Sequence, residues 1–207
     1  MQEYSSKLLE NAINQIAKLP GIGRKTAVRL ALYLLRQSSE EVSLFTESIA
    51  NMKNNIFYCS KCHNVSDSPS CEICSNPHRN SSQICVVQDI RDVIAIENTQ
   101  VYKGVYHVLG GVISPLQGIG VADINIGSLL SRIDMEEIGE VILALPATTE
   151  GDTTAYYISQ HIRKRNQNIQ ISVIARGVSV GNDLENTDEI TLTRSILNRV
   201  DFDSTLK

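Results

Sequence analysis

The sequence lacks several features that would assign it to a broad class at once. No apolar run is long enough to cross a membrane, and the first residues lack the basic stretch and apolar block of a secretory signal. There is no internal repeat and no low-complexity segment. We therefore expect a cytoplasmic globular protein with no membrane partner, and a hydrophobic content of 42% is sufficient for a folded core.

An excess of positive charge is also missing. The 207 residues carry a formal net charge of −4, which argues against a uniformly basic nucleic-acid binder. The charge is unevenly distributed, however, because the stretch from Lys18 to Arg36 contains five basic residues and no acidic one. In the stretch from Asp183 to Asp203, most of the charged residues are acidic. A local basic patch can therefore still bind an anionic partner.

Four cysteines form two knuckles in one short polar segment, with the spacing Cys59-x2-Cys62-x8-Cys71-x2-Cys74. Each knuckle directs two thiolates at one point, which is the arrangement that tetrahedral Zn²⁺ requires. The connector of residues 63–70 is too short and polar to bury a core of its own, so metal binding would hold it. The spacing predicts a structural zinc site with four thiolate ligands.

Other interpretations of these residues exist. Two disulfides are the alternative, but they are rare inside cells, where thiols stay reduced. His63 follows Cys62 directly and could compete as a ligand, although we expect it to be solvated. Cys85 stands apart in an apolar run and is expected to be a small buried residue.

The N-terminal part has the pattern of two helices joined by a glycine turn. Apolar residues recur at helical spacing over 5–18 and again over 24–35, and Leu19-Pro20-Gly21-Ile22-Gly23 lies between them. Such a helix–hairpin–helix brings backbone N–H groups close to a phosphate. The expected DNA-binding residues are Lys25, Arg29, Arg24, Gly21 and Gly23. The alternative is an ordinary helical hairpin with solvated cations.

After the cysteines the pattern changes to short apolar strands alternating with helices. Strands are expected at 84–87, 105–109, 140–145 and 169–174, and helices at 89–97, 126–133 and 153–165. This alternation predicts an α/β fold with a parallel sheet and helices on both faces. A further helix is expected at about 40–54, and a less regular tail from residue 175 includes a helix at 191–199.

Acidic residues follow two of the expected strands. Gln88-Asp89 follows the first strand, and a loop with Glu150 and Asp152 follows the strand at 140–145. This α/β part resembles a Toprim domain, in which one glutamate and a later acidic pair bind Mg²⁺. The pair corresponds to Glu150 and Asp152, but the glutamate position is Gln88, a weaker ligand. Capping of the following helix by Asp152 or Thr153, with Glu150 at its positive end, is the alternative that we favour.

The whole chain resembles the RecR family of bacterial recombination mediators. The resemblance rests on LPGIGRKTA, the four-cysteine block ending in CEICSNPHR, SSQICVVQD, GGVISPLQGIG, EVILALPATTEGDTTAYYI and ARGVSVGNDLE, in that order. It implies four parts: a helix–hairpin–helix module (1–54), a zinc finger (55–79), a Toprim-like domain (80–175) and a C-terminal segment (176–207).

The resemblance also implies a function without catalysis. Members of the family bind DNA and act with RecO and RecF in recombinational repair, where they help to load the recombinase on single-stranded DNA. They form dimers and tetrameric rings. The family's zinc ligands correspond to Cys59, Cys62, Cys71 and Cys74, and its DNA-contacting basic pair to Lys25 and Arg29.

Two further hypotheses belong to other functional classes. A Mg²⁺-dependent Toprim enzyme would need a complete carboxylate set, which Gln88 interrupts. A pure protein-interaction module would bind partners through the zinc finger and the sheet, without contacting DNA.

Overall fold

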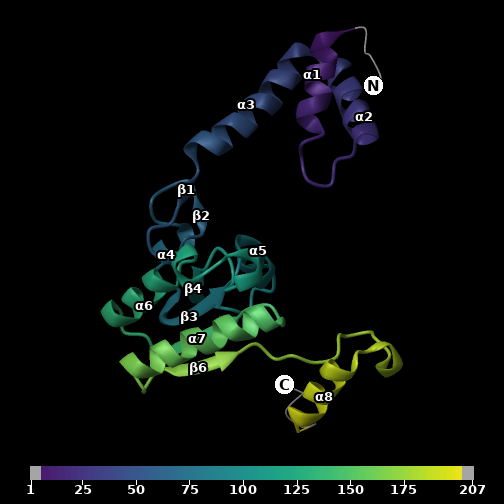
Figure 1. Cartoon of the computed structure of the whole chain (residues 1–207). Coiled ribbons are helices and arrows are strands. Elements are labelled where there is room, and N and C mark those ends of the chain that lie inside the picture. The colour runs from purple at the N-terminus through teal and green to yellow at the C-terminus, as the bar shows by residue number, and fades with distance from the viewer. Residues whose placement is uncertain (1–5, 202–207) are drawn as a thin grey trace. The chain divides into compact units, whose positions relative to one another are not determined.

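The computed structural model describes residues 6–201 and divides the chain into two compact units (Figure 1). The first unit ends at Ile56 and the second begins at Phe57. Each unit has its own hydrophobic core.

The first unit consists of three helices: α1 (Lys7–Ile16), α2 (Arg24–Leu35) and α3 (Ser39–Asn55). Helices α1 and α2 form a hairpin around Ile13, Ala27 and Ala31, which are buried. The small alanine side chains let the two helices approach closely at this point. Helix α3 begins with a capping box between Ser38 and Glu41. The three helices expected in this part are confirmed.

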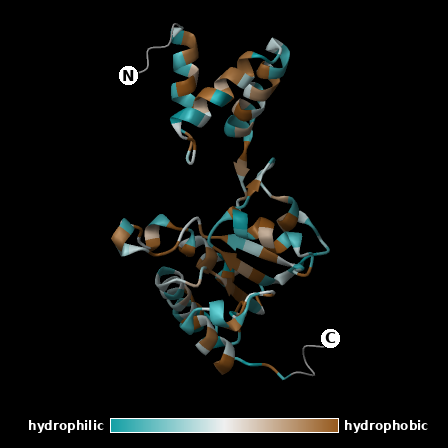
Figure 2. Ribbon diagram, turned by 90° about the vertical axis from the view of Figure 1, so that its right-hand side faces the viewer, coloured by the Kyte–Doolittle hydropathy of each residue, from teal (hydrophilic) through white to brown (hydrophobic). Residues whose placement is uncertain are grey.

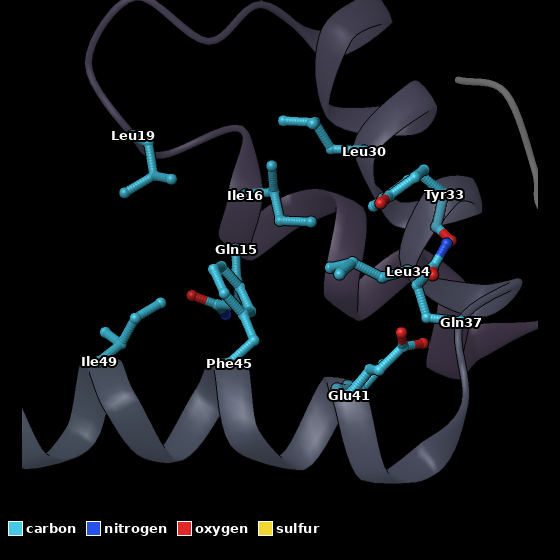
Figure 3. Close-up of a pocket in the computed structure, with 11 residues that line it drawn as sticks. Gln15, Ile16, Leu19, Leu30, Tyr33, Leu34, Gln37, Glu41, Phe45 and Ile49 are labelled. Carbon is cyan, nitrogen blue, oxygen red and sulfur yellow. The ribbon is translucent and has the colours of Figure 1, made fainter.

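An apolar groove of about 600 Å³ lies between the α1–α2 hairpin and α3 (Figure 3). Ile16 and Leu30 approach it from the hairpin side, and Phe45 and Ile49 approach it from α3. Helix α3 has no buried residue, and Phe45 and Ile49 are about half exposed. The apolar face of α3 is therefore open in the single chain.

The second unit starts with the cysteine segment. Strands β1 (Phe57–Tyr58) and β2 (Val65–Ser66) pair antiparallel, and the one-turn helix α4 (Glu72–Ser75) follows. Buried Cys59, Cys62 and Cys71 form a small cluster of their own between these elements.

A parallel sheet of four strands forms the centre of the second unit, in the order β4-β3-β5-β6. Its strands are β3 (Asn80–Val87), β4 (Gly104–Val108), β5 (Glu140–Ala144) and β6 (Gln170–Val173). The helices of this part are α5 (Ile90–Asn98), α6 (Ile126–Met135) and α7 (Thr149–Arg165). The polar segment 76–82 has the composition of a linker, but its last three residues, from Asn80 on, belong to strand β3.

Each face of the sheet has a separate core, as the alternation of side chains along a strand requires. Ile84 and Val86 of β3 belong to the core that contains residues of α6 and α7, such as Leu129 and Ile158. Cys85 and Val87 belong to the opposite core, together with residues of α5. Figure 2 shows hydrophobic residues gathered on the strands of this sheet. The expected parallel sheet covered on both faces is confirmed, and so is the burial of Cys85.

The remaining elements are short. They are the 3-10 helices η1 (Pro115–Gln117), η2 (Val121–Asp123) and η3 (Leu184–Asn186), and the last helix α8 (Glu189–Leu197). Helix α8 has no buried residue. Across residues 6–201, none of the helices combines the length and the apolarity that a membrane crossing needs.

Candidate functional site

The turn between α1 and α2 has the geometry that its glycines predict. Ile22 donates its backbone N–H to the carbonyl of Leu19 at 3.1 Å, and Gly21 has a φ of +78°. This left-handed conformation at the third position of the turn is the one that favours glycine, with Pro20 before it. The turn is followed by Gly23, the residue immediately before α2.

The N-terminus of α2 (Arg24–Leu35) has no side-chain cap from its N-cap residue. Gly23 is its N-cap and offers no side chain, and the first N–H groups of any α-helix have no partner within the helix. A Cβ added at Gly23 would meet no atom within 4 Å, and its φ of −76° suits any residue. Neither crowding nor strain within the described chain therefore requires glycine at this position. Glycine at position 23 leaves open space next to the backbone N–H groups of the first turn of α2, where the positive end of the helix dipole lies.

Lys25 and Arg29 lie four residues apart on α2, and both are exposed. Within residues 6–201, neither side chain has a hydrogen bond or an ion pair with another part of the chain. Two cations on one helix face can follow a phosphate backbone. Arg24, in contrast, donates to the side-chain oxygen of Asn14 on α1. The predicted residues thus surround the N-terminus of one helix, with Arg24 also bridging the hairpin.

The four cysteines converge on one point. Their sulfur atoms all lie within 4.8 Å of one another, and the Sγ atoms of Cys62 and Cys71 are 3.5 Å apart. Zinc–sulfur bonds of about 2.3 Å in a tetrahedron place the sulfur atoms about 3.8 Å apart, so the arrangement fits Zn²⁺. The backbone N–H of Cys71 also points to the sulfur of Cys59 at 3.4 Å, and that of Cys74 to the sulfur of Cys71 at 3.4 Å. Such N–H groups stabilise thiolates.

The crowded thiols perturb one another. Hydrogen bonding with Cys62 lowers the pKa of Cys71 to about 2, and hydrogen bonding with Cys71 raises the pKa of Cys62 above its ordinary range. A divalent cation would favour the thiolate form of all four residues, which is how zinc replaces protons in such a site. The cluster is consistent with a structural zinc site, and the cysteines are free of disulfides.

The cysteine segment is attached to the sheet through His63. Its Nε2 atom lies 2.8 Å from the Oγ of Ser128 in α6, and its ring meets the ring of His107 edge-on at 5.2 Å. His107 is fully buried, and its Nε2 lies 2.8 Å from the carbonyl oxygen of Asn125. The expectation that His63 is merely solvated is therefore wrong. Its partners lie 44 and 65 positions away, and no local pattern predicts them.

The acidic residues at the carboxyl end of the sheet do not form a carboxylate set. Asp89 is the N-cap of α5, where its Oδ1 accepts the backbone N–H of Arg91 at 2.9 Å. The hydrogen bond from the Arg91 side chain lowers the pKa of Asp89. Asp89 therefore has a capping role, and Gln88 offers only an amide at the position before it.

Helix α7 begins earlier than its sequence suggests, and neither Asp152 nor Thr153 caps it. Thr148 is the N-cap, and its hydroxyl accepts the N–H of Gly151 at 3.1 Å. A Cβ at Gly151 would collide with the carbonyl of Pro146, so glycine permits this close helix start. The prediction of capping by Asp152 or Thr153 is wrong, because a threonine four or five residues earlier supplies the oxygen. Glu150 does lie in the first turn of α7, at its positive end.

Asp152 instead binds two arginines from the end of the chain. Its Oδ1 lies 2.7 Å from Nη2 of Arg176, and its Oδ2 lies 3.4 Å from Nη2 of Arg194. Both oxygens are thereby engaged, so the residues as arranged do not fit a Mg²⁺ site at Glu150 and Asp152. Neither arginine was predicted from the sequence to bind Asp152. The sequence offers one indication of this pairing: Arg176 lies just before the acidic stretch 183–203, Arg194 lies within it, and both are positively charged like the partners that Asp152 needs.

Comparisons with known families cover nearly the whole chain. A model for the RecR helix-hairpin-helix matches residues 9–53, and one for the four-cysteine zinc finger domain of RecR matches residues 56–76. A Toprim domain model matches residues 82–175, and a RecR C-terminal model matches residues 177–200. The order of these matches is the order of the structural elements described above.

Whole-chain relatives agree with these matches. The chain is 55% identical to a recombination protein RecR of Porphyromonas gingivalis over 207 residues, which cover 100% of this chain and 99% of the relative. It is 55% identical to that of Bacteroides fragilis over 205 residues, covering 99% of each chain. It is 53% identical to that of Flavobacterium johnsoniae over 205 residues, covering 99% of this chain and 98% of the relative. The chain therefore belongs to the RecR family.

Proposed function

We propose that this protein is a non-catalytic, DNA-binding mediator of recombinational repair, which acts with RecO and RecF to load the recombinase on single-stranded DNA. The observation that carries the proposal is the exposed glycine hairpin, where Lys25 and Arg29 flank the uncapped N-terminus of α2. Membership of the RecR family, whose relatives are recombination proteins, supports the recombination role.

The hairpin suits a phosphate backbone and offers little to read a base sequence. Backbone N–H groups and cations bind phosphate oxygens of any sequence, and such binding weakens steeply with salt. A mediator that works at gaps and junctions wherever damage occurs needs this kind of contact. We accordingly assign DNA binding to Lys25, Arg29, Arg24, Gly21 and Gly23, within a module of residues 1–54.

The other parts of the chain supply structure in this proposal. Cys59, Cys62, Cys71 and Cys74 hold a structural zinc ion in a finger of residues 55–79, a role that reduced thiols in the cytoplasm allow. The Toprim-like domain (80–175) and the C-terminal segment (176–207) then serve as scaffold. Absence of turnover is supported by Gln88 and by the pairing of Asp152 with two arginines, because these positions then offer Mg²⁺ no free carboxylate pair.

We further propose that a second copy of the chain covers the groove beside α3, as part of a dimer or a tetrameric ring. The groove is lined by apolar residues of all three helices of the first unit. Its open side presents half-exposed Phe45 and Ile49 from α3, and apolar side chains grouped in this way can pack against a partner chain. A ring also lets an acidic protein present its basic hairpins to DNA.

The proposal is tested by a loading assay on gapped DNA coated with single-strand-binding protein. The purified chain is added with RecO, RecF and the recombinase, and filament formation is followed by the rate of ATP hydrolysis by the recombinase. We expect the chain to speed filament formation and to leave the DNA intact in the presence of Mg²⁺. DNA cleavage that is lost in Glu150→Ala would instead support the Toprim enzyme, and loading unaffected by Lys25→Ala/Arg29→Ala would support a protein-interaction module.

A further inference from the structure

The carboxylate of Asp152 joins three elements that are distant in sequence. It lies in the first turn of α7, Arg176 follows the end of β6, and Arg194 lies in α8. The two arginines bind different oxygens, Arg176 at 2.7 Å and Arg194 at 3.4 Å. The hydrogen bond from Arg176 lowers the pKa of Asp152, so the carboxylate is charged at neutral pH. One side chain therefore fixes both ends of the segment from residue 176 to residue 194.

Two guanidinium groups meet the carboxylate where a Toprim domain would present a metal ligand. A guanidinium is always charged and its planar donors match carboxylate oxygens, so two of them can satisfy a carboxylate that a divalent cation would otherwise bind. The other positions that would bind the cation do not offer a free carboxylate either, because Gln88 is an amide and Asp89 caps helix α5. We propose that Arg176 and Arg194 occupy the place of the divalent cation, and that Asp152 thereby serves as the anchor of the C-terminal segment.

Apolar packing of the described part of this segment, residues 176–201, is slight. Helix α8 has no buried residue, and Ile190, Ile196 and Leu197 are exposed. A hollow of about 490 Å³ remains where Arg194 and Asn198 of this region face apolar residues of β5, α7 and the end of β6. Because apolar packing is slight here, the ion pairs provide a large share of the attachment. The Asp152 side chain is 45% exposed, so solvent and salt weaken these pairs.

The anchor is therefore weak enough to open. Its release would uncover the hollow and free α8 to move, while the buried sheet remains intact. This inference is independent of DNA binding, because it concerns the second unit alone and none of the hairpin residues.

Hydrogen exchange of the full-length, zinc-loaded chain tests the anchor. In Asp152→Asn the side chain keeps its size but loses its charge, and we expect amide exchange over residues 189–197 to rise about tenfold. The matched control is Glu150→Gln, which removes one charge from the same helix turn. Among the described residues, Glu150 has no ion pair. We expect the control to exchange like the wild type, and strands β3 and β5 to stay protected in all three proteins. Equal exchange of α8 in Asp152→Asn and the wild type would overturn the proposal.

A second measurement tests the substitution of the metal. Mn²⁺ at millimolar concentration is titrated into the wild type and Asp152→Asn, and bound Mn²⁺ is measured by electron paramagnetic resonance. We expect the two proteins to bind the same small amount, because Asp152 is already occupied. Mn²⁺ binding by the wild type that disappears in Asp152→Asn would show a working cation site and overturn the proposal.

Discussion

Val108 donates its backbone N–H to the carbonyl oxygen of Cys62 at 2.8 Å. Cys62 is one of the four clustered cysteines, and Val108 is the last residue of β4, at one edge of the sheet. The cysteine segment thus accepts a hydrogen bond from a backbone N–H at the end of an edge strand. Together with the contact between His63 and Ser128, this hydrogen bond couples the metal site to the fold of the second unit.

Removal of zinc should therefore loosen more than the cysteine segment. We expect about one zinc per chain by elemental analysis, and faster exchange of the Val108 amide after chelation. Cys71→Ser should lose zinc and lower the melting temperature, because bound zinc supplies folding energy to such segments. Cys85→Ser is a suitable control for zinc content, since Cys85 lies outside the cluster. Zinc-free protein purified in reductant with wild-type stability would contradict this prediction.

The two glycines of the hairpin should differ in their effects. Gly21→Ala forces a side chain into a φ of +78° and should destabilise the first unit by about 1–2 kcal/mol, measured by denaturant unfolding. Gly23→Ala has an ordinary φ and open space, so it should cost less, below about 1 kcal/mol, because alanine is only a poorer N-cap than glycine. Its added methyl group should nevertheless weaken DNA binding. Unchanged DNA affinity in Gly23→Ala would argue against close approach of a phosphate at this point.

Cys85 should remain unreactive while the chain is folded. Burial raises its pKa from 9.0 to about 12, so the thiol stays protonated when exposed cysteines ionise. Below pH 9 it is protonated in both the folded and the unfolded chain. Between that pH and about 12 only the unfolded chain loses the proton, so Cys85 lowers the free energy of unfolding as pH rises.

Mass spectrometry after iodoacetamide treatment checks this, with Cys85 labelled only in denaturant. The fall in stability above pH 9 should be smaller in Cys85→Ala than in the wild type. Rapid labelling of Cys85 in the folded chain would contradict its burial.

The groove beside α3 should control the oligomeric state. Phe45→Ser/Ile49→Ser removes two apolar residues that line the groove. We expect this variant to have a smaller molar mass than the wild type in light scattering, with no loss of zinc. Leu116→Ser is the control, because Leu116 is 96% exposed and lies outside the groove. Equal mass for all three proteins would exclude this groove as the interface.

Most of the fold, but only part of the candidate site, could be predicted from the sequence. Apolar runs such as Ile84–Val87 and the paired cysteines are local signals, and local signals predict strands and metal knuckles well. The partners of Asp152 and His63 are set by tertiary packing, which joins positions 24, 42 and 65 residues apart. The cap of α7 is ambiguous for a different reason: Thr148 and Asp152 are both good capping residues, and only the residue at which the helix starts distinguishes them.

The most direct test of the central claim is DNA binding by the hairpin across a salt series. Wild type, Lys25→Ala/Arg29→Ala and Arg163→Ala/Lys164→Ala are titrated onto a labelled gapped duplex. The last variant removes two exposed cations from the end of α7 and so matches the change in charge. We predict that the hairpin variant loses affinity for DNA. The plot of the logarithm of its binding constant against the logarithm of the salt concentration should be less steep by about 2. The control should bind like the wild type. A hairpin variant that binds with wild-type affinity and slope would contradict the account.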